Sequence, residues 1–161
     1  MKDRVFMLPE RPAAAGPPSP AKGGHAAAES AKPEWLKWHG SGGVLVVDDE
    51  EAVRLAVACA VTRLGFTAKV ASDGAQAIAL FKSDPGAYVL VLMDLRMPGI
   101  DAGEIMRNLR LARPEIPVLV MSGLSTQEAL ARTSGMPISG FLHKPFMMEE
   151  LASSLRAVLE A

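Results

Sequence analysis

Short apolar runs alternate along this chain with stretches of helical period, from residue 44 to the C-terminal end. Most of the apolar runs are rich in Val, Leu and Met without alternation, a pattern typical of strands buried on both faces of a sheet. The strands predicted in this way are residues 44–47, 67–71, 89–93, 118–121 and 141–143. The run at 67–71 is the least apolar, which favours a place near an edge of the sheet.

Helices are predicted between these strands. Val53, Val57 and Val61 recur at a spacing that puts them on one helix face, and Gly65 suits the end of that helix. The other predicted helices carry Ala77, Ile78 and Phe81; Ile105, Leu109 and Ala112; a weak stretch at 126–133; and Leu151, Leu155, Val158 and Leu159. Strands alternating with helices predict right-handed crossovers and a parallel sheet. We expect an α/β fold: a flavodoxin-like (βα)5, doubly wound five-stranded parallel sheet of order 2-1-3-4-5.

Residues 1–42 differ in composition from the rest. They hold half of the twelve prolines together with runs of Ala and Gly, which bury too little apolar surface to offset chain entropy. We therefore expect a mostly disordered Pro/Ala/Gly-rich tail or linker at 1–42, followed by one domain at 43–161. Trp35 and Trp38 stand three apart and would share a helix face. We expect them to dock on the neighbouring domain or to contact nothing.

Charge and cysteine content narrow the function classes. The net charge of −1 favours neither a nucleic-acid backbone nor an anionic membrane as a partner. Cys59 is the only cysteine, so an internal disulfide and a cysteine-based metal site are excluded. No apolar run approaches the roughly 18 residues of a membrane helix. We expect a cytoplasmic protein without membrane contact.

Polar residues interrupt the predicted strands at one end. Asp48 and Asp49 follow the first strand, Asp94 the third, Ser122 the fourth and Lys144 the fifth. In a parallel sheet these positions meet at the carboxyl edge, where open α/β folds bind their ligands. Three neighbouring carboxylates repel one another, which favours binding of a hard divalent ion such as Mg²⁺.

The same residues suit phosphoryl transfer, which needs positioning and charge neutralisation. Asp94 is the predicted nucleophile and phosphoacceptor, forming an acyl phosphate. Lys144 adds a positive charge beside the metal, and the hydroxyl of Ser122 can donate a hydrogen bond to a phosphoryl oxygen.

Residues 44–161 resemble the receiver domain of the two-component response-regulator family. The resemblance is carried, in the family's order and spacing, by Asp48-Asp49, Leu92-Met93-Asp94-Leu95-Arg96-Met97-Pro98-Gly99, Ser122 and Lys144-Pro145-Phe146. Each motif alone is weak, whereas the combination is highly specific.

The resemblance implies a metal site and a switch. Asp49 and Asp94 would bind Mg²⁺ directly with the backbone carbonyl of Arg96, and Asp48 would act mainly through water. The Lys144-Pro145 bond would be cis. After phosphorylation Ser122 would move towards the phosphoryl group, Phe141 would turn inward, and the surface of the fourth helix, fifth strand and fifth helix would repack. That surface is also a candidate homodimer contact.

The resemblance also implies the partners: a histidine kinase or a histidine phosphotransfer protein that donates from phosphohistidine. The chain ends after the last predicted helix, so we expect output by protein contact or phosphoryl relay. Val5-Phe6-Met7-Leu8-Pro9 resembles the end of a kinase ATP-binding domain, and residues 38–49 resemble the junction before the receiver of hybrid sensor kinases. These resemblances predict the C-terminal receiver of a hybrid sensor histidine kinase, or the product of a gene descended from one. The chain itself is expected to assist its own phosphorylation and dephosphorylation without being an enzyme.

Two other functions compete. A degenerate receiver would be a phosphate-independent interaction module, but the intact set of acidic, hydroxyl and ammonium groups argues against it. A phosphatase of the haloacid-dehalogenase type also uses an aspartyl phosphate. It needs a second aspartate two residues after the nucleophile, where this chain has Arg96. His143 is expected to be a strand residue without chemistry.

Overall fold

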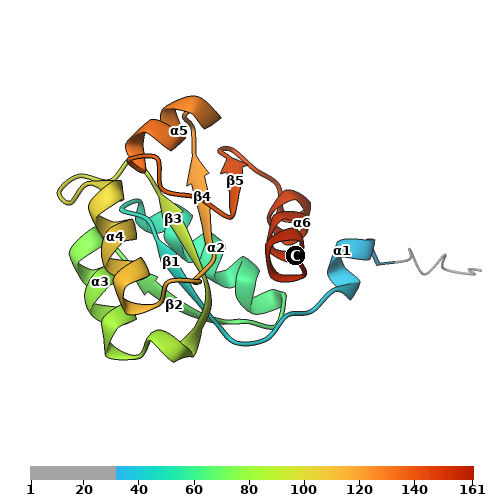
Figure 1. Ribbon diagram of the computed structural model, residues 1–161. Helices are drawn as coiled ribbons and strands as arrows, with labels where there is room; N and C mark the ends of the chain where they lie inside the picture. The colour runs from blue at the N-terminus through green and yellow to red at the C-terminus, as the bar shows by residue number, and fades with distance from the viewer. Residues whose placement is uncertain (1–31) are drawn as a thin grey trace, which may run out of the picture. The chain divides into compact units, whose positions relative to one another are not determined.

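A computed structural model of the protein describes residues 32–161. The predicted disordered tail therefore lies largely outside the described residues. The strands are β1 (Gly43–Val47), β2 (Thr67–Ala71), β3 (Tyr88–Asp94), β4 (Val118–Ser122) and β5 (Gly140–His143). The helices are α1 (Glu34–Lys37), α2 (Glu51–Arg63), α3 (Gly74–Ser83), α4 (Ala102–Ala112), α5 (Thr126–Arg132) and α6 (Met148–Leu159), with a 3₁₀ turn, η1, at Pro85–Ala87 (Figure 1).

All neighbouring strands are parallel, and their order is β2-β1-β3-β4-β5. The flavodoxin-like topology and the edge position of the second strand, both predicted from the apolar runs, are confirmed. β1 and β3 lie side by side although a strand and two helices separate them in sequence, because the crossover reverses direction at β1. This reversal is the switch point at which a crevice is expected.

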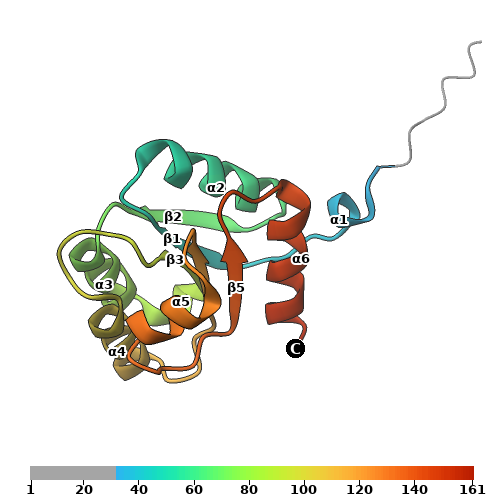
Figure 2. The same ribbon diagram turned by 90° about the horizontal axis from the view of Figure 1, so that it is seen from above.

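Alternate strand residues enter two separate cores. Leu45 and Val47 of β1 pack with residues of α3 and α4, whereas Val44 and Val46 pack with residues of α2 and α6. Figure 2 shows α2 and α3 on opposite sides of the sheet. Because strands such as β1 and β4 are buried at every position, they carry the uninterrupted apolar sequence of a sheet covered on both faces.

Local signals at the helix ends agree with this fold. Gly65 follows α2 with φ +94°, a left-handed conformation that glycine adopts without a Cβ penalty. Asp73 caps α3 by accepting a hydrogen bond from the amide of Gln76 at 2.8 Å. Ser125 and Glu128 form a capping box at the start of α5. These ends fix where each loop leaves the sheet.

The segment before β1 packs on the domain. Trp38 donates its indole N–H to the Glu160 carboxylate at 2.9 Å, and its ring centroid lies 5.7 Å from that of Phe66. Trp35 is half-buried against the core beneath α2 and α6. The expectation that these tryptophans dock on the neighbouring domain is therefore met, and the compact unit extends from Lys32 to Ala161.

The predicted boundary at residue 43 stays a prediction, although residues 32–42 pack as part of this unit. Among residues 32–161, no helix has the length and apolar character that crossing a membrane requires.

Candidate functional site

The ends of β1 and β3 bring two aspartates together. The register pairs Val47 with Met93, so the next residues, Asp48 and Asp94, leave neighbouring strands at the same level. Asp94 is the last residue of β3, and Asp48 directly follows β1. The two aspartates thus meet at the switch point because each ends or follows an apolar strand, and these two strands are neighbours.

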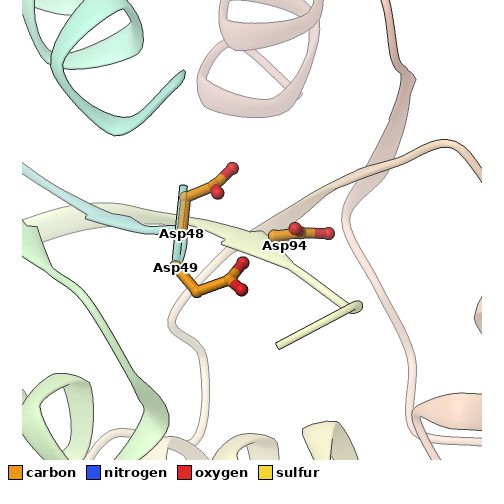
Figure 3. A group of neighbouring side chains, drawn as sticks. All are labelled: Asp48, Asp49 and Asp94. Carbon is orange, nitrogen blue, oxygen red and sulfur yellow. The ribbon is translucent and has the colours of Figure 1, made fainter. Parts of the chain in front are cut away.

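Asp48, Asp49 and Asp94 form an acidic cluster at this edge. One carboxylate oxygen from each residue lies within 4.8 Å of the others. Figure 3 shows the three side chains projecting from the adjoining ends of β1 and β3. Asp48 and Asp94 are buried and Asp49 is exposed, so one side of the cluster is open to solvent.

Lys144 joins the cluster from the end of β5. Its Nζ lies 2.6 Å from Oδ2 of Asp48 and 3.2 Å from Oδ2 of Asp94. Burial opposes the charged form of Lys144, but the hydrogen bond to Asp48 and the charge of Asp94 prevail and raise the pKa of the ammonium group. Lys144 therefore stays protonated and balances part of the carboxylate charge.

Backbone amides hold the remaining oxygens of the two buried aspartates. The amide of Arg96 donates to Oδ1 of Asp94 at 3.1 Å, and the amide of Glu50 donates to Oδ1 of Asp48 at 2.9 Å. The cleft above the cluster is lined by Asp49, Glu50, Asp94, Arg96, Gly123 and Lys144. Each buried carboxylate is thus fixed by one cation and one amide.

Ser122 ends β4 at the same sheet edge and is fully buried. Its Oγ accepts a hydrogen bond from the amide of Leu124 at 3.1 Å, and its carbonyl accepts one from the amide of Lys144 at 2.9 Å. Phe141 in β5 is half-buried against the core on the α3 and α4 side. The Lys144–Pro145 peptide bond is cis, in agreement with the bond expected from the family resemblance.

Sequence reasoning missed three neighbours of the cluster. Glu50 and Gly123 line the cleft, and each directly follows a residue that the sequence analysis named. Arg54 donates from Nη1 to the backbone carbonyl of Asp48 at 2.7 Å. Its position on the first turns of the helix after the acidic pair is the only sequence signal that could have found it.

The donor set fits a hard divalent cation. Mg²⁺ prefers carboxylate, carbonyl and water oxygens, and the cluster offers three carboxylates, one of them exposed to water. No thiol or imidazole belongs to the cluster, which argues against zinc or copper. The acidic pocket is therefore suited to Mg²⁺ coordination.

An apolar groove adjoins the cleft. It is lined by Ala52, Val53, Ala56 and Val57 of α2 and by Lys144, Pro145 and Phe146 after β5. A smaller hollow continues it towards Met148 and Leu151 of α6. Because Lys144 lines both the groove and the acidic cleft, the groove lies next to the carboxylates.

Comparison with known proteins identifies one family. The family model described as response regulator receiver domain matches residues 44–156. The sensor kinase CckA of Brucella abortus (strain 2308) is 34% identical over 122 residues, which cover 75% of this chain and 13% of that protein. The response regulator MprA of Mycobacterium ulcerans (strain Agy99) is 36% identical over 119 residues, covering 72% of this chain and 49% of MprA.

The solved structures agree with the sequence matches. The receiver domain from the hybrid histidine kinase CckA matches with a TM-score of 0.61 and 30% identity, covering 73% of this chain and 99% of that chain. This chain spans about half the length of MprA and a smaller part of CckA. The similarity therefore concerns the receiver domain within longer relatives.

Proposed function

This chain belongs to the response regulator receiver domain family, and from that premise we propose that it accepts a phosphoryl group on Asp94 in a phosphorelay. The donor is a phosphohistidine on a histidine kinase or a histidine phosphotransfer protein. The observation that carries the proposal is the convergence of three carboxylates and the Lys144 ammonium group on one sheet edge. Transfer depends on Mg²⁺.

In the proposed reaction a carboxylate oxygen of Asp94 attacks the phosphorus atom. An oxygen–phosphorus bond forms, the nitrogen–phosphorus bond to histidine breaks, and the imidazole leaves with the bond's electron pair. Asp94 is held for attack by the Arg96 amide and by Lys144. Bound Mg²⁺ supplies positive charge for the phosphoryl oxygens.

The other residues hold the metal and the product. Asp48, Asp49, Asp94 and the backbone carbonyl of Arg96 are the proposed metal ligands, with Asp48 acting mainly through water. Lys144 would pair with the phosphoryl group on Asp94, since its ammonium group already reaches that carboxylate.

The proposed switch runs through β4 and β5. Ser122 turns its hydroxyl from the Leu124 amide towards a phosphoryl oxygen, and Phe141 moves into the vacated space. Half-burial of Phe141 supports this, because the ring is still partly exposed and gains burial when it turns inward. The surface of α5, β5 and α6 then repacks, and we propose it as the output surface and the homodimer contact.

The apolar groove beside the cleft is the proposed seat of the phosphodonor. A histidine carried on a helix that packs against α2 and Phe146 comes close to Asp94, since Lys144 lines both hollows. We propose a cytoplasmic protein that works either beside a separate kinase or as the receiver of a hybrid kinase. The match to CckA supports the second arrangement.

The proposal is tested with acetyl phosphate, a small phosphodonor, in the presence of Mg²⁺. We expect a mass gain of one phosphoryl group that is lost under base. The gain does not form when Mg²⁺ is chelated before acetyl phosphate is added. Asp94→Asn abolishes the gain because it removes the nucleophile. The matched control is Asp101→Asn, which changes an exposed aspartate before α4 that caps no helix amide.

The competing functions give different results. A degenerate interaction module shows no mass gain in the unaltered protein, which would refute the phosphoacceptor role. An aspartyl-phosphate phosphatase releases phosphate from many donors with repeated turnover. A mass gain retained by Asp94→Asn would place the acceptor on another residue.

A further inference from the structure

We propose that Arg54 is a positioning residue that aims the carboxylate of Asp49 at the metal ion. The inference rests on the proposed function, because it concerns the same Mg²⁺ site. It assigns a role to a residue of α2 that touches neither the cleft nor a carboxylate oxygen.

Asp49 is the member of the acidic cluster whose side chain needs external positioning. Within residues 32–161, the carboxylates of Asp48 and Asp94 are bonded to Lys144 and to backbone amides, whereas no hydrogen bond or ion pair engages the carboxylate of Asp49. Asp49 is also exposed. The backbone of Asp49 therefore sets the direction of the Cα–Cβ bond from which its carboxylate extends.

Both peptide groups that flank Asp49 are held by side chains. The carbonyl of Asp48, in the peptide before it, accepts the Arg54 Nη1 hydrogen bond at 2.7 Å. The amide of Glu50, in the peptide after it, donates to Oδ1 of Asp48 at 2.9 Å. With both peptide planes fixed, the Cα–Cβ bond of Asp49 has one direction. Of the two hydrogen bonds that fix these planes, the one from Arg54 is made by a residue outside the acidic cluster.

Arg54 is itself fixed by α2. Its amide donates to the carbonyl of Glu50 at 2.9 Å, which closes the first turn of the helix. Val57 and Val61 of the same helix are buried against the sheet. The guanidinium group therefore reaches the loop from a rigid element, as precise positioning of a metal ligand requires.

Lys144 and Arg54 form hydrogen bonds with different kinds of group beside the acidic cluster. Lys144 bonds carboxylate oxygens of Asp48 and Asp94, which the metal also needs. Arg54 bonds a backbone carbonyl, so it leaves the carboxylate oxygens free for the metal. Groups that orient metal ligands in this way contribute to affinity without binding the ion.

The test measures Mg²⁺ affinity by isothermal titration calorimetry on the full chain. Arg54→Gln is expected to raise the Mg²⁺ Kd by about tenfold, the size typical for loss of an outer group that orients a ligand. Arg54→Lys keeps the charge and a hydrogen-bond donor, so its Mg²⁺ Kd is expected to lie between those of the unaltered protein and Arg54→Gln. Arg63→Gln is the matched control, since it removes an exposed arginine from the last turn of the same helix.

Phosphorylation by acetyl phosphate gives a second readout. The Arg54→Gln variant is expected to need more Mg²⁺ for half-maximal rate and to approach the unaltered rate when Mg²⁺ is saturating. A positioning role predicts a higher Mg²⁺ requirement with a nearly unchanged maximal rate, because a site filled with Mg²⁺ regains the geometry of the bound state.

The outcomes separate this inference from the function on which it rests. If the unaltered protein fails to bind Mg²⁺, the proposed function is refuted as well. If it binds Mg²⁺ and Arg54→Gln binds equally well, only the role of Arg54 is overturned. A lower thermal midpoint in chelator with an unchanged Kd in both Arg54 variants would reduce Arg54 to a structural helix residue.

Discussion

Lys144 holds together two carboxylates that arrive on different strands. Its side chain is 21% exposed, while that of Asp48 is fully buried, so the pair lies at the border of the interior. Removal of the ammonium group leaves a buried carboxylate with one amide partner, and an unpaired buried charge is costly. The residue proposed to serve the phosphoryl group thus also stabilises the metal-free protein.

Lys144→Met is expected to lower the free energy of unfolding in chelator by about 1–3 kcal/mol at neutral pH, because the variant breaks a partly buried ion pair. The pKa of Lys144 is raised in the folded state. Its contribution is therefore fully present below the unfolded-state pKa of about 10.4 and is lost as pH rises through the folded value.

Urea denaturation of both proteins between pH 7 and pH 11 checks this. The difference in unfolding free energy should be constant at first and then shrink at the alkaline end. The control is Lys69→Met, which changes an exposed lysine on the edge strand β2. A difference that grows above pH 10 would contradict the assignment.

At the scale of elements, the segment from α1 to β1 is fastened to the turn between α2 and β2. The amide of Gly40 donates to the carbonyl of Leu64 at 2.8 Å, and the amide of Thr67 donates to the carbonyl of Gly42 at 2.9 Å. Phe66 packs against Gly40 so closely that a Cβ at this glycine would lie 1.8 Å from the ring carbon Cζ. The Phe66 ring thus requires a residue without a side chain at position 40.

Gly40→Ala is expected to destabilise the protein by about 1–3 kcal/mol, because the added methyl group overlaps the Phe66 ring and forces the segment to shift. Phe66→Leu should also destabilise, through lost packing against Trp38. The double variant should be less destabilised than the sum of the two, since the smaller side chain leaves room for the methyl group.

Thermal and urea denaturation of the four proteins give this double-mutant cycle. Gly123→Ala is the matched control, because nothing lies within 4 Å of a Cβ built there. Additive effects of the two changes would show that positions 40 and 66 have no coupling energy, which would contradict the predicted overlap.

At the scale of the whole domain, the sheet divides the interior into two cores that share the same strands. Leu92 of β3 belongs to the core under α2 and α6, and its neighbour Met93 belongs to the core under α3 and α4. Both are fully buried. The site therefore stands on a strand that is packed from two sides, which keeps Asp94 in place.

Leu92→Ala is expected to cost about 2–5 kcal/mol of unfolding free energy, because it opens a cavity in the centre of the sheet. Leu111→Ala, the control, removes the same atoms from a side chain that is 82% exposed and should change stability by less than about 0.5 kcal/mol. Urea denaturation measures both. Equal effects would contradict the burial of the central strand.

The sequence by itself determined the five strands, their order and the residues at their carboxyl ends. Short unbroken apolar runs between helical stretches favour strands of a sheet covered on both faces. The observed strands differ from the predicted ones by one residue at several ends, as at Tyr88 and Gly140. The site residues were visible because Asp94 and Lys144 interrupt apolar runs abruptly. The 3₁₀ turn at Pro85–Ala87 lies in none of the predicted elements.

Only the tertiary structure decided how the groups beyond these strand ends meet. Arg54 reaches the carbonyl of Asp48, and the indole of Trp38 reaches Glu160 across 122 positions of sequence. Such contacts depend on side-chain direction and on the packing of whole elements, which leave no periodic signal in the chain. Periodicity reports which face of an element is buried, but the partner on that face is set by three-dimensional packing.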